Sequence, residues 1–280
     1  MPYQAEISRA NPSCFLFIID QSGSMGDPFG GSGGVGRSKA QELADALNHL
    51  LQTLVTRCAK GEEVLNRFEV GVIGYGQSLG SALQGALAGQ DIVPIREIAF
   101  NPMRLENRMK KVSDGAGGLV EQSFQFPVWI DPVHNGGTPM CEALRRGKSI
   151  FEAWIGSHQG SYPPTLIHIT DGESTDGDPT EIASQIKNLG TTDGPLCMFN
   201  LHLSSNQSPS IRFPDSTSTF PDQFAQLLFN ISSPLPPPIR GAASNEGFKV
   251  TDDSRGFVFN AGIVETIQFL DIGTRVSNLR

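Results

Sequence analysis

The sequence predicts an α/β fold with a doubly wound, mainly parallel central sheet flanked by helices. Three observations predict this fold. Short apolar runs alternate with segments of helical period along the 280 residues. The runs are apolar at nearly every position, as strands buried on both faces are. Two of the runs also end directly in an aspartate.

The first elements of the chain have the clearest patterns. Residues 15–19 are apolar and β-prone, which predicts the first strand. From residue 38 to residue 58 the apolar side chains recur at helical spacing and Gly61 follows, which predicts a long helix. Residues 67–74 alternate and then become apolar, so we expect the second strand there.

Residues 75–137 are rich in glycine and carry a weaker pattern. We expect a third strand near residues 83–95, a short helix near residues 105–112 and an extended segment near residues 124–130. The chain has no internal repeat, here or elsewhere.

The alternation resumes after residue 138. Pro139 suits the first position of a helix, because the N–H that proline lacks would have no partner there. In order, we expect a helix at 139–154, a strand at 165–170, a helix at 180–189, a strand at 196–203, a polar loop at 204–220, a helix at 221–231, a stiff proline-rich spacer at 233–239, a strand at 256–260 and a helix at 263–270.

The alternation continues to the end of the chain and indicates one domain. We therefore expect a single domain over residues 1–280, with its core at about residues 13–272. Insertions are expected at about residues 26–37, 77–136 and 204–220.

Composition excludes several classes of function. The chain carries 21 basic and 29 acidic residues, a net charge of −8, whereas a nucleic-acid surface needs clustered Lys and Arg. No run approaches the roughly 20 apolar residues that span a bilayer. The polar N-terminus lacks the apolar core of a secretory signal, and the widely spaced cysteines indicate free thiols, so we expect a cytoplasmic protein. The cysteines are Cys14, Cys58, Cys141 and Cys197.

Oxygen-bearing side chains follow two of the predicted strands. Asp20-x-Ser22-x-Ser24 comes directly after the first strand, and Asp171 comes directly after the strand at 165–170. Thr138 adds a hydroxyl at the start of a helix. In doubly wound sheets, ligands bind outside the carboxyl ends of the strands, where the strand order reverses. Two carboxylates and three hydroxyls suit a hard cation such as Mg²⁺ or Mn²⁺, and they leave a position for another donor.

These five residues resemble the metal-ion-dependent adhesion site (MIDAS) of von Willebrand factor type A (VWA) domains, in order and in context. The resemblance covers roughly residues 15–270 and is weakest at 75–137. It implies a Rossmann-like VWA fold and one Mg²⁺ (or Mn²⁺) ion, whose open position accepts an acidic residue of a partner. The segment Gly136-Gly-Thr138-Pro is similar to the bacterial intracellular branch that includes the TerY-like tellurite-resistance proteins.

The resemblance implies a protein-interaction module, and the composition gives no reason to expect a nucleic-acid or membrane partner. Its partner would present Asp or Glu and would belong to a signalling or stress-response assembly, for example as a kinase, phosphatase or AAA+ ATPase component. We expect the rim of the site, where the partner binds, to include Gln21, Asp27, Phe29, His134, Gly137 and Glu173.

Two other functions stay open. A metal-dependent hydrolase would use the same cation, with His134, Glu173, Asp176 or Asp178 as a general base. A scaffold with no functional metal would bind its partner through the glycine-rich loop at 30–36 or through the P-x-x-P segment that begins at Pro234. The glycine-rich loop also nearly matches a nucleotide-binding P-loop, but Arg37 stands where lysine is needed.

Overall fold

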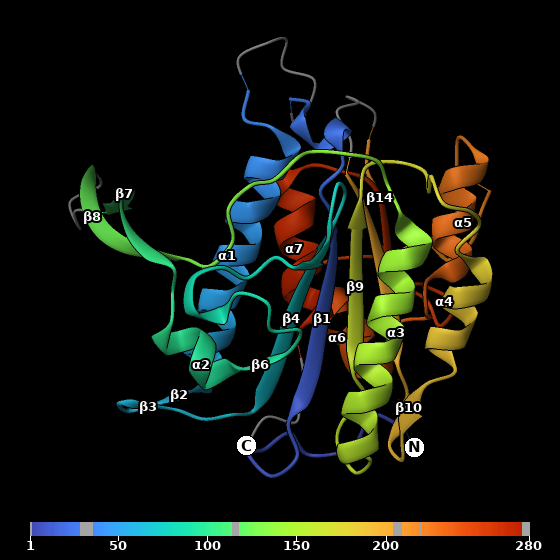
Figure 1. Ribbon diagram of the computed structural model, residues 1–280, viewed down its shortest axis with the longest axis horizontal. Coiled ribbons are helices and arrows are strands. Elements are labelled where there is room, and N and C mark those ends of the chain that lie inside the picture. The colour runs from blue at the N-terminus through green and yellow to red at the C-terminus, as the bar shows by residue number, and fades with distance from the viewer. Residues whose placement is uncertain (1, 29–35, 114–117, 204–208, 219, 276–280) are drawn as a thin grey trace.

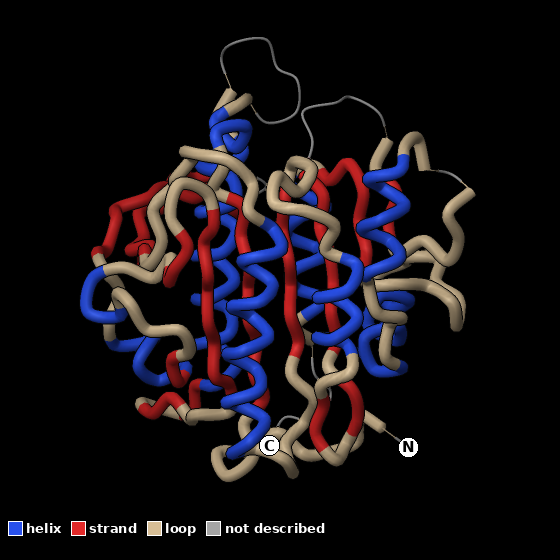
Figure 2. Tube along the Cα trace, turned by 45° about the vertical axis from the view of Figure 1, so that its right-hand side comes forward, coloured by secondary structure: helices blue, strands red, loops and turns tan. Residues whose placement is uncertain are grey.

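The computed structural model describes residues 2–28, 36–113, 118–203, 209–218 and 220–275. An eight-stranded sheet lies between two layers of helices (Figures 1 and 2). Across the sheet, the strands are β13 (Ile211–Arg212), β14 (Phe257–Ala261), β12 (Cys197–Leu203), β9 (Thr165–Thr170), β1 (Ser13–Asp20), β4 (Phe68–Tyr75) and β5 (Leu79–Ser81), and β6 (Val93–Pro94) also pairs with β4.

The five central strands are parallel, and the outer strands β5, β6 and β13 are antiparallel to their neighbours. From β1, the chain first builds β4 on one side and later returns to build β9 on the other side. The strand order therefore reverses between β1 and β9, and in such sheets this position is where ligands bind.

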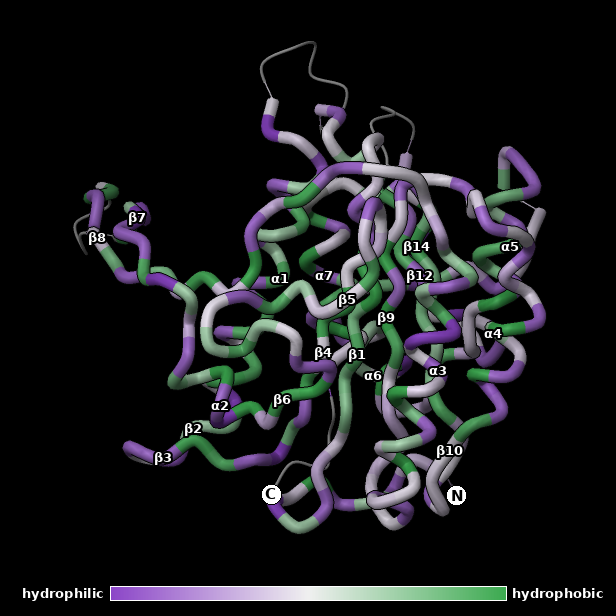
Figure 3. Tube along the Cα trace, viewed as in Figure 1, coloured by the Kyte–Doolittle hydropathy of each residue, from purple (hydrophilic) through white to green (hydrophobic). Residues whose placement is uncertain are grey.

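Each face of the sheet has its own hydrophobic core. On β1, Phe15, Phe17 and Ile19 face one core, and the alternate residues face the other, as a period of two requires. Figure 3 shows the hydrophobic residues gathered along these inner strands. One face is covered by α1 (Lys39–Cys58), α2 (Ile95–Phe100), α6 (Pro237–Asn245) and α7 (Ile263–Gly273), and the other by α3 (Met140–Ser157), α4 (Thr180–Lys187) and α5 (Gln223–Ile231). The predicted doubly wound α/β fold is confirmed.

Helix α1 begins at Lys39, directly after its capping residue Ser38. Ser38 caps the helix, because its hydroxyl accepts a hydrogen bond from the Gln41 amide and the Gln41 side chain accepts one from the Ser38 amide. This reciprocal cap fixes Lys39 as the first helical residue.

The predicted helix near residues 105–112 is wrong. These residues form β7 (Arg104–Ser113), which pairs over ten residues with β8 (Leu119–Val128). The extended segment predicted near residues 124–130 is a strand, although its bounds are those of β8. The hairpin projects from the body of the molecule (Figure 1). Cross-strand pairing with β8 outweighs the helix propensity of the β7 residues here. Its exposed hydrophobic residues are Leu105, Met109, Leu119 and Val120.

Two further expectations need correction. The third strand predicted near 83–95 is instead a 3₁₀ turn, η3 (Gly85–Leu87), followed by the two-residue β6. The proline-rich segment is not only a spacer, since α6 begins within it at Pro237 and Leu235 is buried. Short pieces complete the fold, namely η1 (Gly23–Gly26), the pair β2 (Ala59–Lys60) and β3 (Glu63–Val64), and the pair β10 (Gly190–Thr191) and β11 (Gly194–Pro195).

All four cysteines are buried and free. Within the described ranges, no helix is both long enough and apolar enough to cross a bilayer.

Candidate metal centre

The candidate ligands meet at the reversal point of the sheet. Asp20 is the last residue of β1, and Asp171 directly follows β9, the strand beside it. Thr170 joins the two strand ends, because its hydroxyl donates to Asp20 Oδ2 at 2.8 Å. This edge, where η1 also lies, is at the top of Figure 1.

Asp20 is a buried carboxylate whose hydrogen-bond donors, among the described residues, are neutral groups. Its residue is 1% exposed, and its Oδ1 accepts a hydrogen bond from the Ser22 amide at 2.8 Å. Burial raises the pKa of Asp20, and the hydrogen bonds from Ser22 and Thr170 only partly oppose that rise. Within the part of the chain that the structure describes, no basic side chain forms an ion pair with Asp20.

A chain of hydroxyls connects Ser22 to the second carboxylate. The Ser22 and Ser24 hydroxyl oxygens lie 3.0 Å apart, and the Ser24 hydroxyl donates to Asp171 Oδ1 at 2.8 Å. The turn η1 places Ser24 at this position, directly after β1. Three of the five predicted ligands are therefore linked by hydrogen bonds, in the order Ser22, Ser24, Asp171.

Thr138 is buried beside the same group. Its amide donates to Thr175 Oγ1 at 3.1 Å, and its carbonyl accepts from the Thr175 amide at 2.9 Å. A β-carbon placed on Gly172 would lie 3.9 Å from Thr138 Oγ1, so this hydroxyl faces the residue after Asp171. Within the described ranges, Thr138 forms no hydrogen bond with Asp20, Ser22 or Ser24, so its part in the site depends on this position.

The loop after β9 is tied to the start of α3. The Asp176 carboxylate accepts hydrogen bonds from the Cys141 and Glu142 amides at 2.9 and 2.8 Å. Burial alone would raise the pKa of Asp176, but these hydrogen bonds lower it, as expected for a carboxylate at a helix N-terminus. The tie holds Thr138, two residues before α3, against the β9 side of the site.

The predicted rim residues differ in exposure. Asp27, His134, Gly137 and Glu173 are exposed near the site, whereas Gln21 is half-buried. The Gln21 side chain lies against Gly74 of β4, where a β-carbon would collide with it, and its part in partner binding stays a prediction. Phe29 lies outside the described residues, as does most of the glycine-rich loop at 30–36.

Sequence reasoning missed a lysine in the site. Lys39 is 5% exposed, and its Nζ lies 2.6 Å from Asp171 Oδ2 and 3.8 Å from Asp27 Oδ2. The Asp171 side chain is itself inaccessible to solvent. A buried lysine at the start of a helix has no signature in the sequence that separates it from an ordinary exposed one.

A buried polar chain behind the site was also missed. The Tyr75 hydroxyl lies 2.7 Å from His168 Nε2, and His168 Nδ1 lies 2.9 Å from Asn200 Oδ1. The Asn200 amide then donates to the Ser232 hydroxyl at 2.8 Å. Burial lowers the pKa of His168 to about 4. The one available signal was a histidine in the middle of an otherwise apolar strand.

The donor set fits a hard divalent cation. It consists of two carboxylates and three hydroxyls, and oxygen donors of this kind are the ligands that Mg²⁺ and Mn²⁺ prefer. Among the described residues, no group of three or more His, Cys, Asp and Glu side chains is placed to hold a metal. Hydroxyls therefore have to supply most of the donors at this site.

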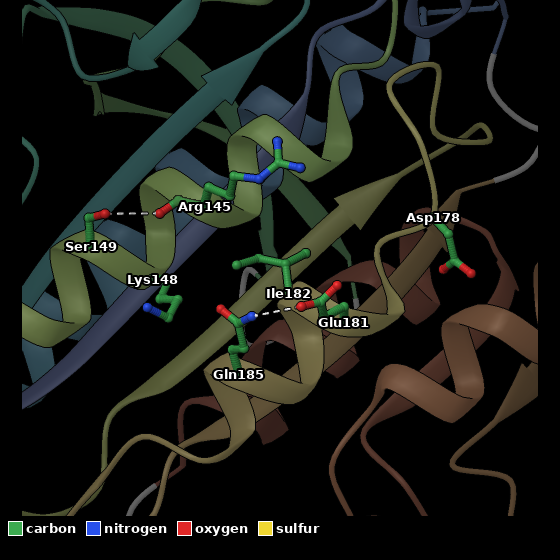
Figure 4. Close-up of a pocket in the computed structure, with 7 residues that line it drawn as sticks. All are labelled: Arg145, Lys148, Ser149, Asp178, Glu181, Ile182 and Gln185. Atoms are coloured by element: carbon green, nitrogen blue, oxygen red, sulfur yellow. Dashed lines mark hydrogen bonds between the residues drawn. The ribbon is translucent and has the colours of Figure 1, made fainter.

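A separate cleft lies between α3 and α4 and contains none of the predicted ligands (Figure 4). Asp178, one of the candidate general bases, lies on this cleft and accepts a hydrogen bond from the Thr180 amide at 2.8 Å. Asp176 caps α3, so both aspartates have structural partners. The remaining lining residues are Arg145, Lys148, Ser149, Glu181, Ile182 and Gln185.

No protein-family model matches the chain, and no curated protein matches it in sequence. Among solved structures, the chain is similar to proximal thread matrix protein 1 from the mussel byssus, with a TM-score of 0.48 and 14% identity over 98% of this chain and 49% of that one. A structure of the same protein with a zinc-occupied MIDAS motif gives a TM-score of 0.46 and 13% identity over 98% and 49%.

The manganese-loaded TRAP protein of Plasmodium vivax is similar at a TM-score of 0.42 and 13% identity, over 96% of this chain and 76% of that one. Because it covers 49% of the mussel protein, this chain spans about half the length of that protein. At these identities the likeness concerns the fold alone.

Proposed function

We propose that this chain is a metal-dependent protein-interaction module, in which a MIDAS-type Mg²⁺ (or Mn²⁺) site binds an acidic residue of a partner. Asp20, Ser22, Ser24, Thr138 and Asp171 would hold the cation. When bound, the cation supplies a Lewis-acidic position that accepts a carboxylate oxygen.

One observation carries the proposal, namely the environment of Asp20. An ionised carboxylate that is 1% exposed and has no ion-pair partner among the described residues is unfavourable until a proton or a cation neutralises it, and a bound cation would do so with the carboxylate still ionised. The nearby hydroxyls of Ser22 and Ser24, whose oxygens lie 3.0 Å apart, supply two further oxygen donors for such a cation. Burial also raises the pKa of Asp20, which is consistent with a group that lacks its counter-charge.

The chain's own residues orient this site. Thr170 fixes one Asp20 oxygen and the Ser22 amide fixes the other, so the carboxylate cannot rotate freely. Ser24 holds one oxygen of Asp171 in the same way. Preorganised ligands of this kind lose little conformational entropy when the cation binds.

For the wider setting we propose a cytoplasmic protein of the TerY-like branch, acting in a signalling or stress-response assembly. The partner would be a kinase, phosphatase or AAA+ ATPase component that presents Asp or Glu. The motif Gly136-Gly-Thr138-Pro and the net charge of −8, which disfavours nucleic acid, support this proposal. A hydrolase is less well supported, because Asp176 and Asp178 are engaged at helix N-termini.

Calorimetric titration of Mg²⁺ and Mn²⁺ into the metal-free protein tests the site. We expect one ion per chain, and we expect Asp20→Ala to abolish binding while the far-ultraviolet circular dichroism stays unchanged. Asp178→Ala, which removes an exposed carboxylate from the neighbouring cleft, should bind the ion as wild type does. Equal binding by Asp20→Ala and wild type would exclude this site.

The partner-binding part of the proposal needs a second test. Pull-down of acidic partner candidates, with and without EDTA, should show binding that requires both the cation and Asp20. Binding that survives EDTA would favour a scaffold without a functional metal. Turnover of an ester substrate that Asp20→Ala removes would favour the hydrolase instead.

A further inference from the structure

We propose that Lys39 is a built-in cation of this site, which weakens metal binding and makes the metal-loaded site select an anionic ligand. The inference rests on the proposed function, because it concerns the same ligands. It adds a residue that lies outside the ligand set and that tunes both affinities.

The structure holds Lys39 in place from both its backbone and its side chain. Its amide donates to the Asp27 carbonyl at 3.0 Å, and the reciprocal cap formed by Ser38 and Gln41 fixes the first turn of α1. Its ammonium donates to Asp171 Oδ2 at 2.6 Å, a contact buried from solvent at both ends. Asp27 lies farther away, at 3.8 Å, and its side chain is 64% exposed, so Asp171 is the main partner.

The two carboxylate oxygens of Asp171 have different partners. One oxygen accepts from Ser24, which belongs to the ligand set, and the other accepts from Lys39. A cation held by Asp171 therefore sits close to a fixed positive charge. The Lys39–Asp171 contact is buried, so the effective dielectric constant beside it is lower than in bulk water and the two positive charges repel more strongly than they would in solvent.

The formal charges predict which ligand completes the site. Asp20 and Asp171 carry two negative charges, and Lys39 carries one positive charge. A divalent cation would leave this group with one net positive charge, and one carboxylate from a partner would neutralise it. Without Lys39, the same loaded site would already be neutral and would gain less from an anion.

A nearby arginine offers a matched control. Arg37 also lies at the start of α1, but it pairs with Glu42 and Asp45 on the outer side of the helix and its side chain is 52% exposed. Removing its charge changes the net charge of the chain as removing that of Lys39 does. It leaves Asp171 untouched.

The first experiment measures Mn²⁺ affinity by calorimetry for wild type, Lys39→Met, Lys39→Gln, Lys39→Arg and Arg37→Met. We expect the two neutral Lys39 variants to bind Mn²⁺ about tenfold more tightly than wild type. Lys39→Gln keeps an N–H donor for Asp171, so it disturbs the fold less than Lys39→Met does. Thermal melts would show whether either variant is misfolded. Lys39→Arg and Arg37→Met should remain within about threefold of wild type. If the neutral variants bind no more tightly than Arg37→Met, the inference is wrong.

The second experiment measures the ligand preference of the Mn²⁺-loaded protein. An acetylated Gly-Glu-Gly amide and its Gln counterpart are titrated while the relaxation of water protons by the bound Mn²⁺ is followed. Wild type should prefer the Glu peptide, and Lys39→Gln should lose at least about threefold of that preference. An unchanged preference would overturn the selectivity part of the inference.

The two proposals fail in distinguishable ways. If Asp20→Ala abolishes binding but the neutral Lys39 variants bind as wild type does, the proposed site stands and the inference fails. If wild type binds no metal, Lys39→Gln binds it, and Asp20→Ala in that background removes it, the inference stands and metal use by the natural chain fails. If no variant binds metal, both fail.

Discussion

The hydroxyl of Tyr75 lies 2.7 Å from Nε2 of His168, and the two rings stack with their centroids 5.8 Å apart. Because His168 Nδ1 faces the Asn200 carbonyl oxygen, the ring proton lies on Nδ1 and Nε2 accepts from the tyrosine. This pair lies directly behind Asp20, since Tyr75 is the β4 residue in register with it.

Tyr75→Phe should lower the free energy of unfolding by about 1–3 kcal/mol, because it leaves His168 Nε2 buried without a donor. Urea denaturation at pH 7.5 measures the change. Tyr162→Phe is the matched control, since the Tyr162 hydroxyl is buried and has no hydrogen-bond partner among the described residues. The control should be at least as stable as wild type, and equal stability of the two variants would contradict the role given to the pair.

Stability should fall as the pH drops from about 6.5 to about 4. Burial lowers the pKa of both His168 and His202 to about 4, below the usual 6.5, so the unfolded chain binds more protons across this window. Each histidine should remove up to about 3 kcal/mol. Urea titrations at several pH values would show this slope.

Replacing one of these histidines should flatten that slope. His202→Gln should roughly halve it, whereas His49→Gln, on the exposed side of α1, should leave it unchanged. A pH dependence that is the same in all three proteins would show that the buried histidines do not cause it.

Asp176→Ala should destabilise the protein by about 0.5–2 kcal/mol, the usual effect of losing a helix cap. It should also weaken metal binding several-fold, because Asp176 ties the loop after β9 to the start of α3, close to Thr138. Thermal melts and Mn²⁺ calorimetry would measure the two effects.

Asp178→Ala separates a general loss of stability from an effect on the site. Asp178 also contacts the amide at the start of its helix, α4, but its hydrogen bonds within the described part of the chain go to Thr180 and do not link α3 to the site. Weaker metal binding by Asp178→Ala to the same degree would mean that Asp176 has no special positioning role.

Shortening the hairpin should leave the core intact. Replacing residues 109–123 by Asn-Gly removes a segment whose described residues, 109–112 and 118–123, are largely exposed, and we expect the melting temperature to change by no more than a few degrees. Extending the deletion through Val128 should destabilise the protein strongly, because Phe126 and Val128 are buried. Equal melting temperatures for the two deletions would contradict this division.

The sequence was most informative where burial alone decides the structure. The strands β1 and β9 are buried on both faces, so their composition is nearly uniform and their ends are marked by Asp20 and Asp171. That pattern predicted the sheet and placed both carboxylates at one edge. In the structure, Thr170 donates a hydrogen bond to Asp20 and Ser24 donates one to Asp171.

Local sequence patterns did not predict the features that depend on contacts between distant parts of the chain. Strand β7 contains Arg, Leu, Glu, Met and Lys, which favour helices, and only its partner β8 makes it a strand. The place of Lys39 in the site was not predicted for a similar reason. Its burial depends on Asp171, which lies 132 residues away, so no local pattern distinguishes it from a solvent-exposed lysine.

The joining of two strand ends by Thr170 and Asp20, 150 residues apart in the chain, has a consequence for folding. A pocket built from such distant segments exists only after the central sheet has formed, so an unfolded or half-folded chain would have no affinity for the ion. By mass action, the ion would then stabilise only the native state. The melting temperature should rise with the logarithm of its free concentration, which makes thermal denaturation a reporter of occupancy.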